Sequence, residues 1–240
     1  PRAELLTWER CTDLASVLDS SGKLRYDVIP VCENGHITGV LCAAAKPPEP
    51  VTSSWLVSRD TSISDLLDLF VQTQRPGLLV FHRQDVVGIV TPADMNKLPA
   101  RFYFYGLLGD IEIALSDRVR EVMQDAMEIV GYLNASRQEE VQQRFAELQK
   151  SNLDTDLVQL LTLADLFGVI ERHPVLRESL GYASKSQVEK MTSGLNELRN
   201  QTMHTNRLIL KRLPDDVVQL RGRLERAEAL WQRLYEGKPA

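Results

Sequence analysis

The sequence predicts an α/β N-terminal part followed by an all-α C-terminal part. Before about residue 100, short apolar runs are separated by turn residues, which is typical of short strands. After it, apolar residues recur with the period of a helix, and Gly and Pro become scarce. A chain of 240 residues fits one large or two modest domains. We therefore expect an α/β domain over residues 1–100 and a helical domain over 101–240.

A helix and a hairpin occur twice in the first half. The predicted strands are 28–31 and 36–41 in the first copy, and 78–81 and 86–90 in the second. The copies are 49 positions apart, which aligns Gly88 with Gly39. Amphipathic helices around 13–18 and 65–70 precede the hairpins, and the Pro-rich segment 47–50 is expected to link the copies. Each sheet must bury a face, so the copies should pack as one domain.

These repeated segments resemble a tandem pair of CBS (cystathionine-β-synthase) domains over about residues 5–98. The resemblance implies an α/β sandwich that binds an adenine nucleotide, such as ATP or AMP, between its copies. In the second copy it implies that Gly88 lets the ligand approach the backbone, Thr91 contacts phosphate and Asp94 contacts ribose. A helix that begins near Pro92 would direct its backbone N–H groups at the anion. The alternative is that Thr91 and Asp94 only cap this helix.

The first copy departs from that pattern. Cys42 and Ala45 stand where the Thr and Asp would be, so we expect one of the two nucleotide sites to be empty.

The second half predicts a bundle of amphipathic helices. They are expected from Leu107 to near Gly131, over 138–150, from Asp154 or Thr155 to before Pro174, from a capping box at Ser186, and from Pro214. The apolar stripes, which include Trp231 on the last helix, are interpreted as core. The aromatic segment 101–106 is either a wedge between the domains or an exposed patch for a homodimer contact.

The chemistry of the helical part is expected at the end of its fourth helix. Asn200 and His204 are four residues apart, so both would lie on one helix face. The segment 199–212 carries Arg199 and further basic residues without an acid, in a chain of net charge −5. Such a local patch attracts phosphate.

This Arg-Asn-x-x-x-His arrangement resembles the motif of the HEPN domain, an all-α family, over about residues 102–236. The resemblance implies a metal-independent ribonuclease in which Arg199, Asn200 and His204 of two subunits face a shared cleft. His204 would transfer protons, and Arg199 would bind the phosphate. The attacking 2′-hydroxyl exists in RNA and not in DNA, so the expected products are a 2′,3′-cyclic phosphate and a 5′-hydroxyl.

A structural role for the same residues remains open. Arg199 would then pair with Glu197 or Glu112, and His204 would interact with the helix dipole.

Together these features predict a homodimeric RNA endonuclease regulated by an adenine nucleotide, as in a stress, toxin or phage-defence response. The alternative is a non-catalytic adenylate sensor whose helical domain mediates dimerisation or partner docking. No metal site is expected, because Cys11, Cys32 and Cys42 show no CxxC spacing and His36 and His82 have no partner at ligand spacing. No apolar run reaches membrane-spanning length, so a cytoplasmic protein without membrane contact is expected.

Overall fold

The computed structural model describes residues 26–33, 36–42, 48–151 and 156–236. They divide into two compact units. The first unit lies within 1–103 and 204–222, and the second within 104–203 and 223–240. The chain thus leaves the first unit, builds most of the second, and returns. Among these described segments, no helix is both long enough and apolar enough to cross a membrane.

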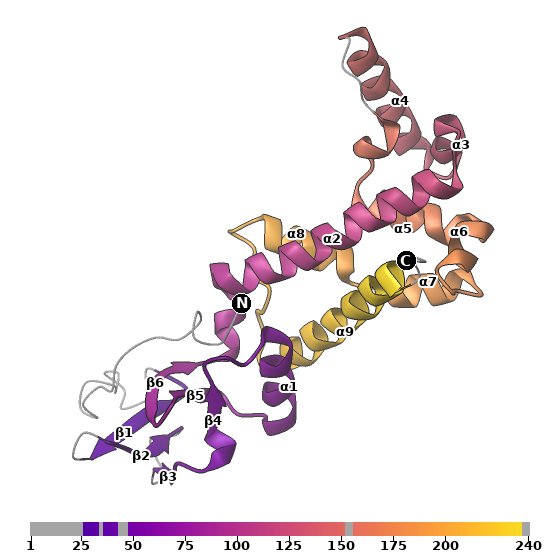
Figure 1. The fold of residues 1–240 in the computed structure, drawn as a ribbon. Helices are drawn as coiled ribbons and strands as arrows, with labels where there is room; N and C mark the ends of the chain where they lie inside the picture. The colour runs from indigo at the N-terminus through magenta and orange to yellow at the C-terminus, as the bar shows by residue number, and fades with distance from the viewer. Residues whose placement is uncertain (1–25, 34–35, 43–47, 152–155, 237–240) are drawn as a thin grey trace. The chain divides into compact units, whose positions relative to one another are not determined.

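The first unit contains two three-stranded sheets, β1-β2-β3 and β4-β5-β6 (Figure 1). The strands are β1 Ile29–Glu33, β2 His36–Leu41, β3 Glu49–Pro50, β4 Leu56–Ser58, β5 Leu78–His82 and β6 Asp85–Val90. Both hairpins, β1–β2 and β5–β6, are antiparallel, whereas β4 pairs with β5 in parallel. The four predicted strands are therefore confirmed to within one or two residues.

The two hairpins share their register as well as their sequence pattern. Val31 pairs with Gly39 in the first hairpin, and Val80 pairs with Gly88 in the second. The pairing shifts directly after Val31 and directly after Val80, so each hairpin has an irregularity at the equivalent position. The 49-residue repeat is thus a structural repeat. The expected helix around 13–18 lies outside the described residues.

The segment 47–50 is not only a linker. Its second half, Glu49–Pro50, forms β3 on the edge of the first sheet, where proline is tolerated. A Cβ at Gly39 would lie 3.1 Å from the Glu49 carbonyl oxygen, so the small residue lets β3 approach β2 closely.

The core of the first unit joins both sheets. Val28 and Val40 from the first hairpin pack in one cluster with Trp55 and Leu79 from the second half of the repeat. The expected packing of the two copies as one domain is confirmed by this cluster. The predicted helix is α1, Ile63–Thr73, whose N-terminal residue Ile63 is fully buried.

A short 3-10 helix, η4 (Pro92–Asn96), follows β6 and leads into α2 (Leu98–Val122). The prediction that the first long helix begins near Leu107 is wrong, because the aromatic segment 101–106 is already helical. Four consecutive aromatic residues occupy this segment, so apolar side chains lie on every side of the helix and the segment shows no helical period. Phe104 is buried, whereas Phe102 is 65% exposed.

Asn96 and Arg101 bind the segment 204–210 into the first unit. The Asn96 side-chain oxygen accepts from the backbone N–H groups of Ile209 (2.7 Å) and Leu210 (3.0 Å), and its amide nitrogen donates to the Leu210 carbonyl (3.1 Å). The buried Arg101 guanidinium donates to the carbonyls of His204 (3.3 Å) and Arg207. We call these bonds the Asn96–Arg101 clamp.

The second unit is helical. Its elements are the C-terminal part of α2, α3 Ala126–Gly131, α4 Ala135–Lys150, η5 Leu157–Leu160, α5 Leu163–Arg172, α6 Pro174–Ser179, α7 Lys185–Thr192, α8 Leu195–Met203 and the C-terminal part of α9 Asp215–Glu236. The helices predicted over 138–150 and from Pro214 are confirmed as α4 and α9. The prediction that the C-terminal part of the chain is largely helical is therefore confirmed. This part contains more and shorter helices than predicted.

Local capping divides three of the predicted helices. The helix predicted from Leu107 to near Gly131 is two helices, because α2 ends at Val122 and Asp125 caps α3. The start predicted at Asp154 or Thr155 lies outside the described residues. The prediction of one continuous helix up to Pro174 is wrong, because Leu157–Leu160 form the 3-10 helix η5 and a capping box of Thr162 and Asp165 then begins α5. The prediction of one helix from Ser186 to His204 is also wrong. Gly194, with φ of +77°, separates α7 from α8, and Ser184 rather than Ser186 caps α7.

The core-facing side of α9 also differs from the prediction at one position. Trp231 is 36% exposed, whereas Leu230 is buried. The buried residues of α9 follow the helical period through Leu220, Leu224 and Ala227 to Leu230 and Leu234, so Trp231 falls outside this stripe.

Candidate functional site

The predicted nucleotide-contact residues lie at the turn between β6 and η4. Thr91 is the N-cap of η4, and its backbone N–H donates to Asp94 Oδ2 at 2.6 Å. The Thr91 hydroxyl donates to the same oxygen at 3.1 Å. The structure therefore brings Thr91 and Asp94 together, in the capping arrangement that the sequence left open as an alternative.

Asp94 is engaged on both carboxylate oxygens. Lys97 Nζ lies 2.5 Å from Asp94 Oδ1, and the Asp94 side chain is 8% exposed. A carboxylate offers about four acceptor positions. Three neighbouring donors occupy most of them, so Asp94 helps to shape the turn whether or not it contacts a ligand.

Gly88 and Pro92 lie on either side of the turn, in β6 and in η4. Gly88 lies in β6 opposite Val80, and Pro92 is the first residue of η4 and is buried. Gly77 precedes β5, and a Cβ added to it would lie 3.2 Å from Thr91 Cγ2. The methyl side of Thr91 thus packs against the chain entering β5, while its hydroxyl side faces Asp94.

The equivalent turn of the first copy begins at Cys42. Cys42 is half-buried and follows β2, whereas Ala45 falls outside the described residues. Burial raises the pKa of the Cys42 thiol, and the nearby Glu49 carboxylate adds to this effect.

Arg199 of α8 faces α2 within the second unit. Its Nε lies 3.8 Å from Glu112 Oε2 and has no hydrogen-bond partner among the described residues. The pairing with Glu112 that the sequence allowed is therefore present as a long ion pair. The other allowed pairing is not, because Glu197 accepts from Arg223 Nη2 at 2.7 Å.

His204 follows the last residue of α8, and the boundary between the two units falls between Met203 and His204. Asn200 and His204 were expected on one helix face, but α8 ends at Met203, so His204 lies just outside the helix. The side chain of His204 is exposed, and its carbonyl accepts from Arg207 N–H at 2.9 Å in a turn. Asn200 is half-buried on α8.

The Asn96–Arg101 clamp is a feature of this region that the sequence did not indicate. It fixes the backbone on both sides of the exposed basic residue Arg207, beginning at His204. Its partners are more than 100 positions apart in the chain, for example 114 for Asn96 and Leu210. Local sequence patterns carry no signal for such bonds.

His173 has a structural role that its sequence position left undefined. Its Nδ1 accepts from the Leu176 backbone N–H at 3.1 Å, which caps α6, and its Nε2 lies 3.6 Å from Glu128. Throughout the part of the chain that the structure describes, no group of three His, Cys, Asp or Glu residues could hold a metal ion.

Comparison with protein families finds a match to the CBS domain over residues 50–100. This segment contains β4, α1, the second hairpin and the Thr91–Asp94 turn, so the resemblance of the second copy is confirmed there. No curated protein and no solved structure matches the chain. None of these comparisons supports the HEPN resemblance of the helical part.

Proposed function

We propose that the chain is a regulatory protein that senses an adenine nucleotide through its CBS segment. The observation that carries this proposal is the match of residues 50–100 to the CBS domain, since domains of this family commonly bind adenine nucleotides as regulatory ligands. The duplicated hairpins and their shared core support it, because they supply two related surfaces within one unit.

The Thr91–Asp94 turn is the proposed contact for the nucleotide. The Thr91 hydroxyl now donates to Asp94, and it would donate instead to a phosphate oxygen when the nucleotide binds. Asp94 would retain its backbone contact with Thr91 and accept a ribose hydroxyl at its remaining position. Lys97, which is 40% exposed and lies beside Asp94, adds a positive charge near the phosphate.

The test is isothermal titration of the full chain with AMP, ADP and ATP. Asp94→Ala is unsuitable as the main variant because it also removes the cap of η4. Thr91→Val is sharper, since it removes the hydroxyl and keeps the backbone bond to Asp94. Loss of one hydrogen bond to a charged group should weaken binding by about 10- to 100-fold.

Thr38→Val is the matched control, because Thr38 is an exposed residue of β2 in the first copy. It should bind the nucleotide as the unchanged chain does. Failure of all three nucleotides to bind at millimolar concentration would contradict the proposal. If Thr91→Val and the unchanged chain bind the nucleotide with equal affinity, the Thr91–Asp94 turn is not the nucleotide contact.

We propose metal-independent RNA cleavage as a second function, at Arg199 and His204. The observation that favours it is that Arg199 Nε makes only a long contact with Glu112 and no hydrogen bond to the described residues. That nitrogen is itself buried, so Arg199 would act on a phosphate through its positive charge, which the long ion pair with Glu112 balances only weakly. His204, Arg207 and Lys211 are exposed on the segment that follows, which would let a proton-transfer group and further cations contact RNA.

The assay for this second function is incubation of structured RNA with the full chain in EDTA, with and without AMP or ATP. We expect fragments that end in a 2′,3′-cyclic phosphate, and their loss in His204→Ala. His36→Ala is the matched control, because His36 is also exposed and lies in β2. RNA that stays intact with every nucleotide would exclude the enzyme and leave the sensor.

A further inference from the structure

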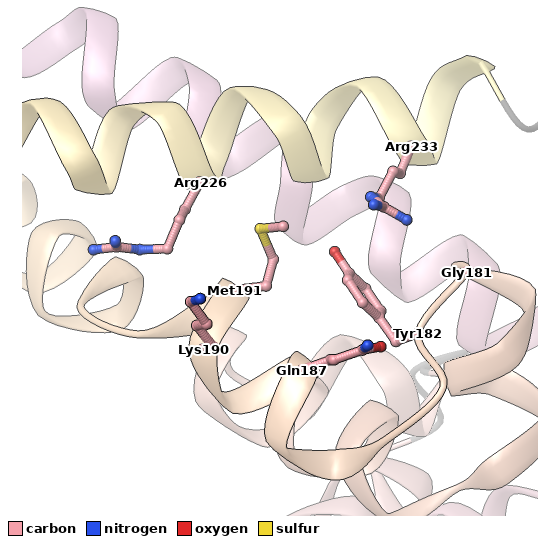
Figure 2. Close-up of a pocket in the computed structure, with 7 residues that line it drawn as sticks. All are labelled: Gly181, Tyr182, Gln187, Lys190, Met191, Arg226 and Arg233. Carbon is pink, nitrogen blue, oxygen red and sulfur yellow. The ribbon is translucent and has the colours of Figure 1, made fainter.

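The second unit contains a pocket that neither proposed function uses. It has a volume of about 390 Å³ and lies between the 181–191 segment and the C-terminal part of α9 (Figure 2). Its lining residues are Gly181, Tyr182, Gln187, Lys190, Met191, Arg226 and Arg233. Pockets that bind small molecules typically have volumes of about 300–1,000 Å³. The pocket is therefore large enough for a small organic ligand.

The described residues that line this pocket include three cations and no acid. Lys190, Arg226 and Arg233 contribute three positive charges. The two arginines are held by backbone carbonyls, since Arg226 Nε donates to Ser193 at 3.1 Å and Arg233 Nη1 donates to Leu180 at 3.2 Å. These bonds fix the side chains, but a carbonyl group is uncharged and does not neutralise the guanidinium. An anionic ligand would balance them.

Tyr182 places an unsatisfied donor at the same pocket. The residue is only 5% exposed, and its hydroxyl has no hydrogen-bond partner among the described residues. Burying a hydroxyl without a partner is unfavourable. Figure 2 shows this hydroxyl directed towards α9, between the side chains of Met191 and Arg233. An acceptor atom of a ligand in the pocket would complete the missing bond.

The position of Arg233 is set by its neighbours. Its guanidinium carbon lies 4.9 Å from the centre of the Tyr182 ring, as in a cation–π contact. Gly181, with φ of +75°, makes room for it, because a Cβ there would lie 2.9 Å from Arg233 Nη1. Burial raises the pKa of Tyr182, although Arg233 opposes this, so the hydroxyl remains a neutral donor near pH 7.

We propose that this pocket binds a small organic phosphate. Tyr182 donates its hydroxyl hydrogen to a phosphate oxygen, and Lys190, Arg226 and Arg233 balance the charge. A phosphate monoester carries about −1.5 to −2 charges near pH 7, whereas a carboxylate carries one, so three cations favour the phosphate. Met191 and the Tyr182 ring supply apolar surface for the organic part of the ligand.

The probe is phenyl phosphate, which joins a dianionic head to an aromatic body. Its binding to the full chain is measured by isothermal titration near neutral pH at low salt. Phenol and benzoate serve as the uncharged and carboxylate comparisons. We expect phenyl phosphate to bind at least about tenfold more tightly than either, since both lack the second negative charge.

Tyr182→Phe and Arg226→Gln locate the binding site. Each should weaken phenyl phosphate binding by about tenfold or more. Tyr182→Phe should not lower the melting temperature of the ligand-free chain, because the hydroxyl that it removes is unsatisfied there. This second readout separates a ligand contact from a structural role. Arg144→Gln is the matched control, since Arg144 is an exposed arginine of α4 that does not line the pocket.

The proposal is overturned if phenyl phosphate fails to bind, or if Tyr182→Phe and Arg226→Gln both bind it as the unchanged chain does. Equal binding of benzoate would overturn the assignment to phosphates. Thr91→Val should leave this binding unchanged, so the outcome is distinguishable from success or failure of the nucleotide site.

Discussion

Substitution of Asn96 by alanine should destabilise the first unit markedly. The change removes three hydrogen bonds, of 2.7, 3.0 and 3.1 Å, to the backbone of Ile209 and Leu210. Both of these residues are at most 5% exposed, so water cannot easily replace the lost partner. At about 1 kcal/mol for each hydrogen bond, the expected loss in the free energy of unfolding is about 3 kcal/mol. This is a substantial part of the total for a typical domain.

The loss is measured by urea unfolding followed by circular dichroism, together with hydrogen exchange of the Ile209 and Leu210 amides. Those two amides should exchange much faster in Asn96→Ala. Asn96→Asp keeps an acceptor for both N–H groups and loses the donor, so it should fall between alanine and the unchanged chain.

Asn206→Ala is the matched control for this experiment, since Asn206 is an exposed residue of the same segment. It should change stability by less than about 0.5 kcal/mol. A loss below about 1 kcal/mol in Asn96→Ala, with unchanged exchange at Ile209 and Leu210, would refute the Asn96–Arg101 clamp.

Three further predictions concern packing, backbone conformation and ionisation. Leu230→Ala should destabilise the chain by about 2–5 kcal/mol in thermal unfolding, whereas Trp231→Ala, at a partly exposed position, should cost far less; equal losses would contradict the described face of α9. Gly194→Ala should cost about 1–3 kcal/mol, because φ is +77° and a Cβ would lie 2.8 Å from Arg223 Nε; a neutral change in urea unfolding would refute this. Burial raises the pKa of Cys42, so its alkylation by iodoacetamide should reach half its maximal rate at a pH above that of a free thiol. The measurement is made with the other two cysteines replaced by serine. A midpoint at or below the pH of a free thiol would contradict the described burial.

The sequence was most informative where structure depends on neighbouring residues. The hairpins around Gly39 and Gly88 follow from alternating apolar runs and turn residues, and the repeat also predicted their common packing. The turn at Thr91 and Asp94 was likewise visible as a motif, because both of its interpretations depend on residues three positions apart.

Helix boundaries in the helical part were less predictable because two neighbouring residues can each be suitable as the N-cap of the same helix. Ser184 and Ser186 both precede suitable residues, and only the structure shows that Ser184 accepts from the Gln187 N–H. Gly194 could be an interior glycine or a helix end by sequence alone, and its positive φ decides for the end.

Contacts between distant segments of the chain were not predictable from one sequence. The Asn96–Arg101 clamp and the pairing of Arg223 with Glu197 join residues whose types are common and whose spacing is unconstrained. The pocket at Tyr182 is similar, since its cations come from α7 and α9, and no motif relates them.

The order in which the chain builds its two units limits how the protein can be divided. The first unit takes its last residues from 204–222, after the whole of 104–203 has been inserted. A polypeptide that stops near residue 103 would lack the backbone groups of Ile209 and Leu210 that bond to Asn96, so it should recover them only when supplied with 204–222 as a separate peptide. Conversely, a single proteolytic cut inside the insert should leave two fragments that co-migrate until they are denatured.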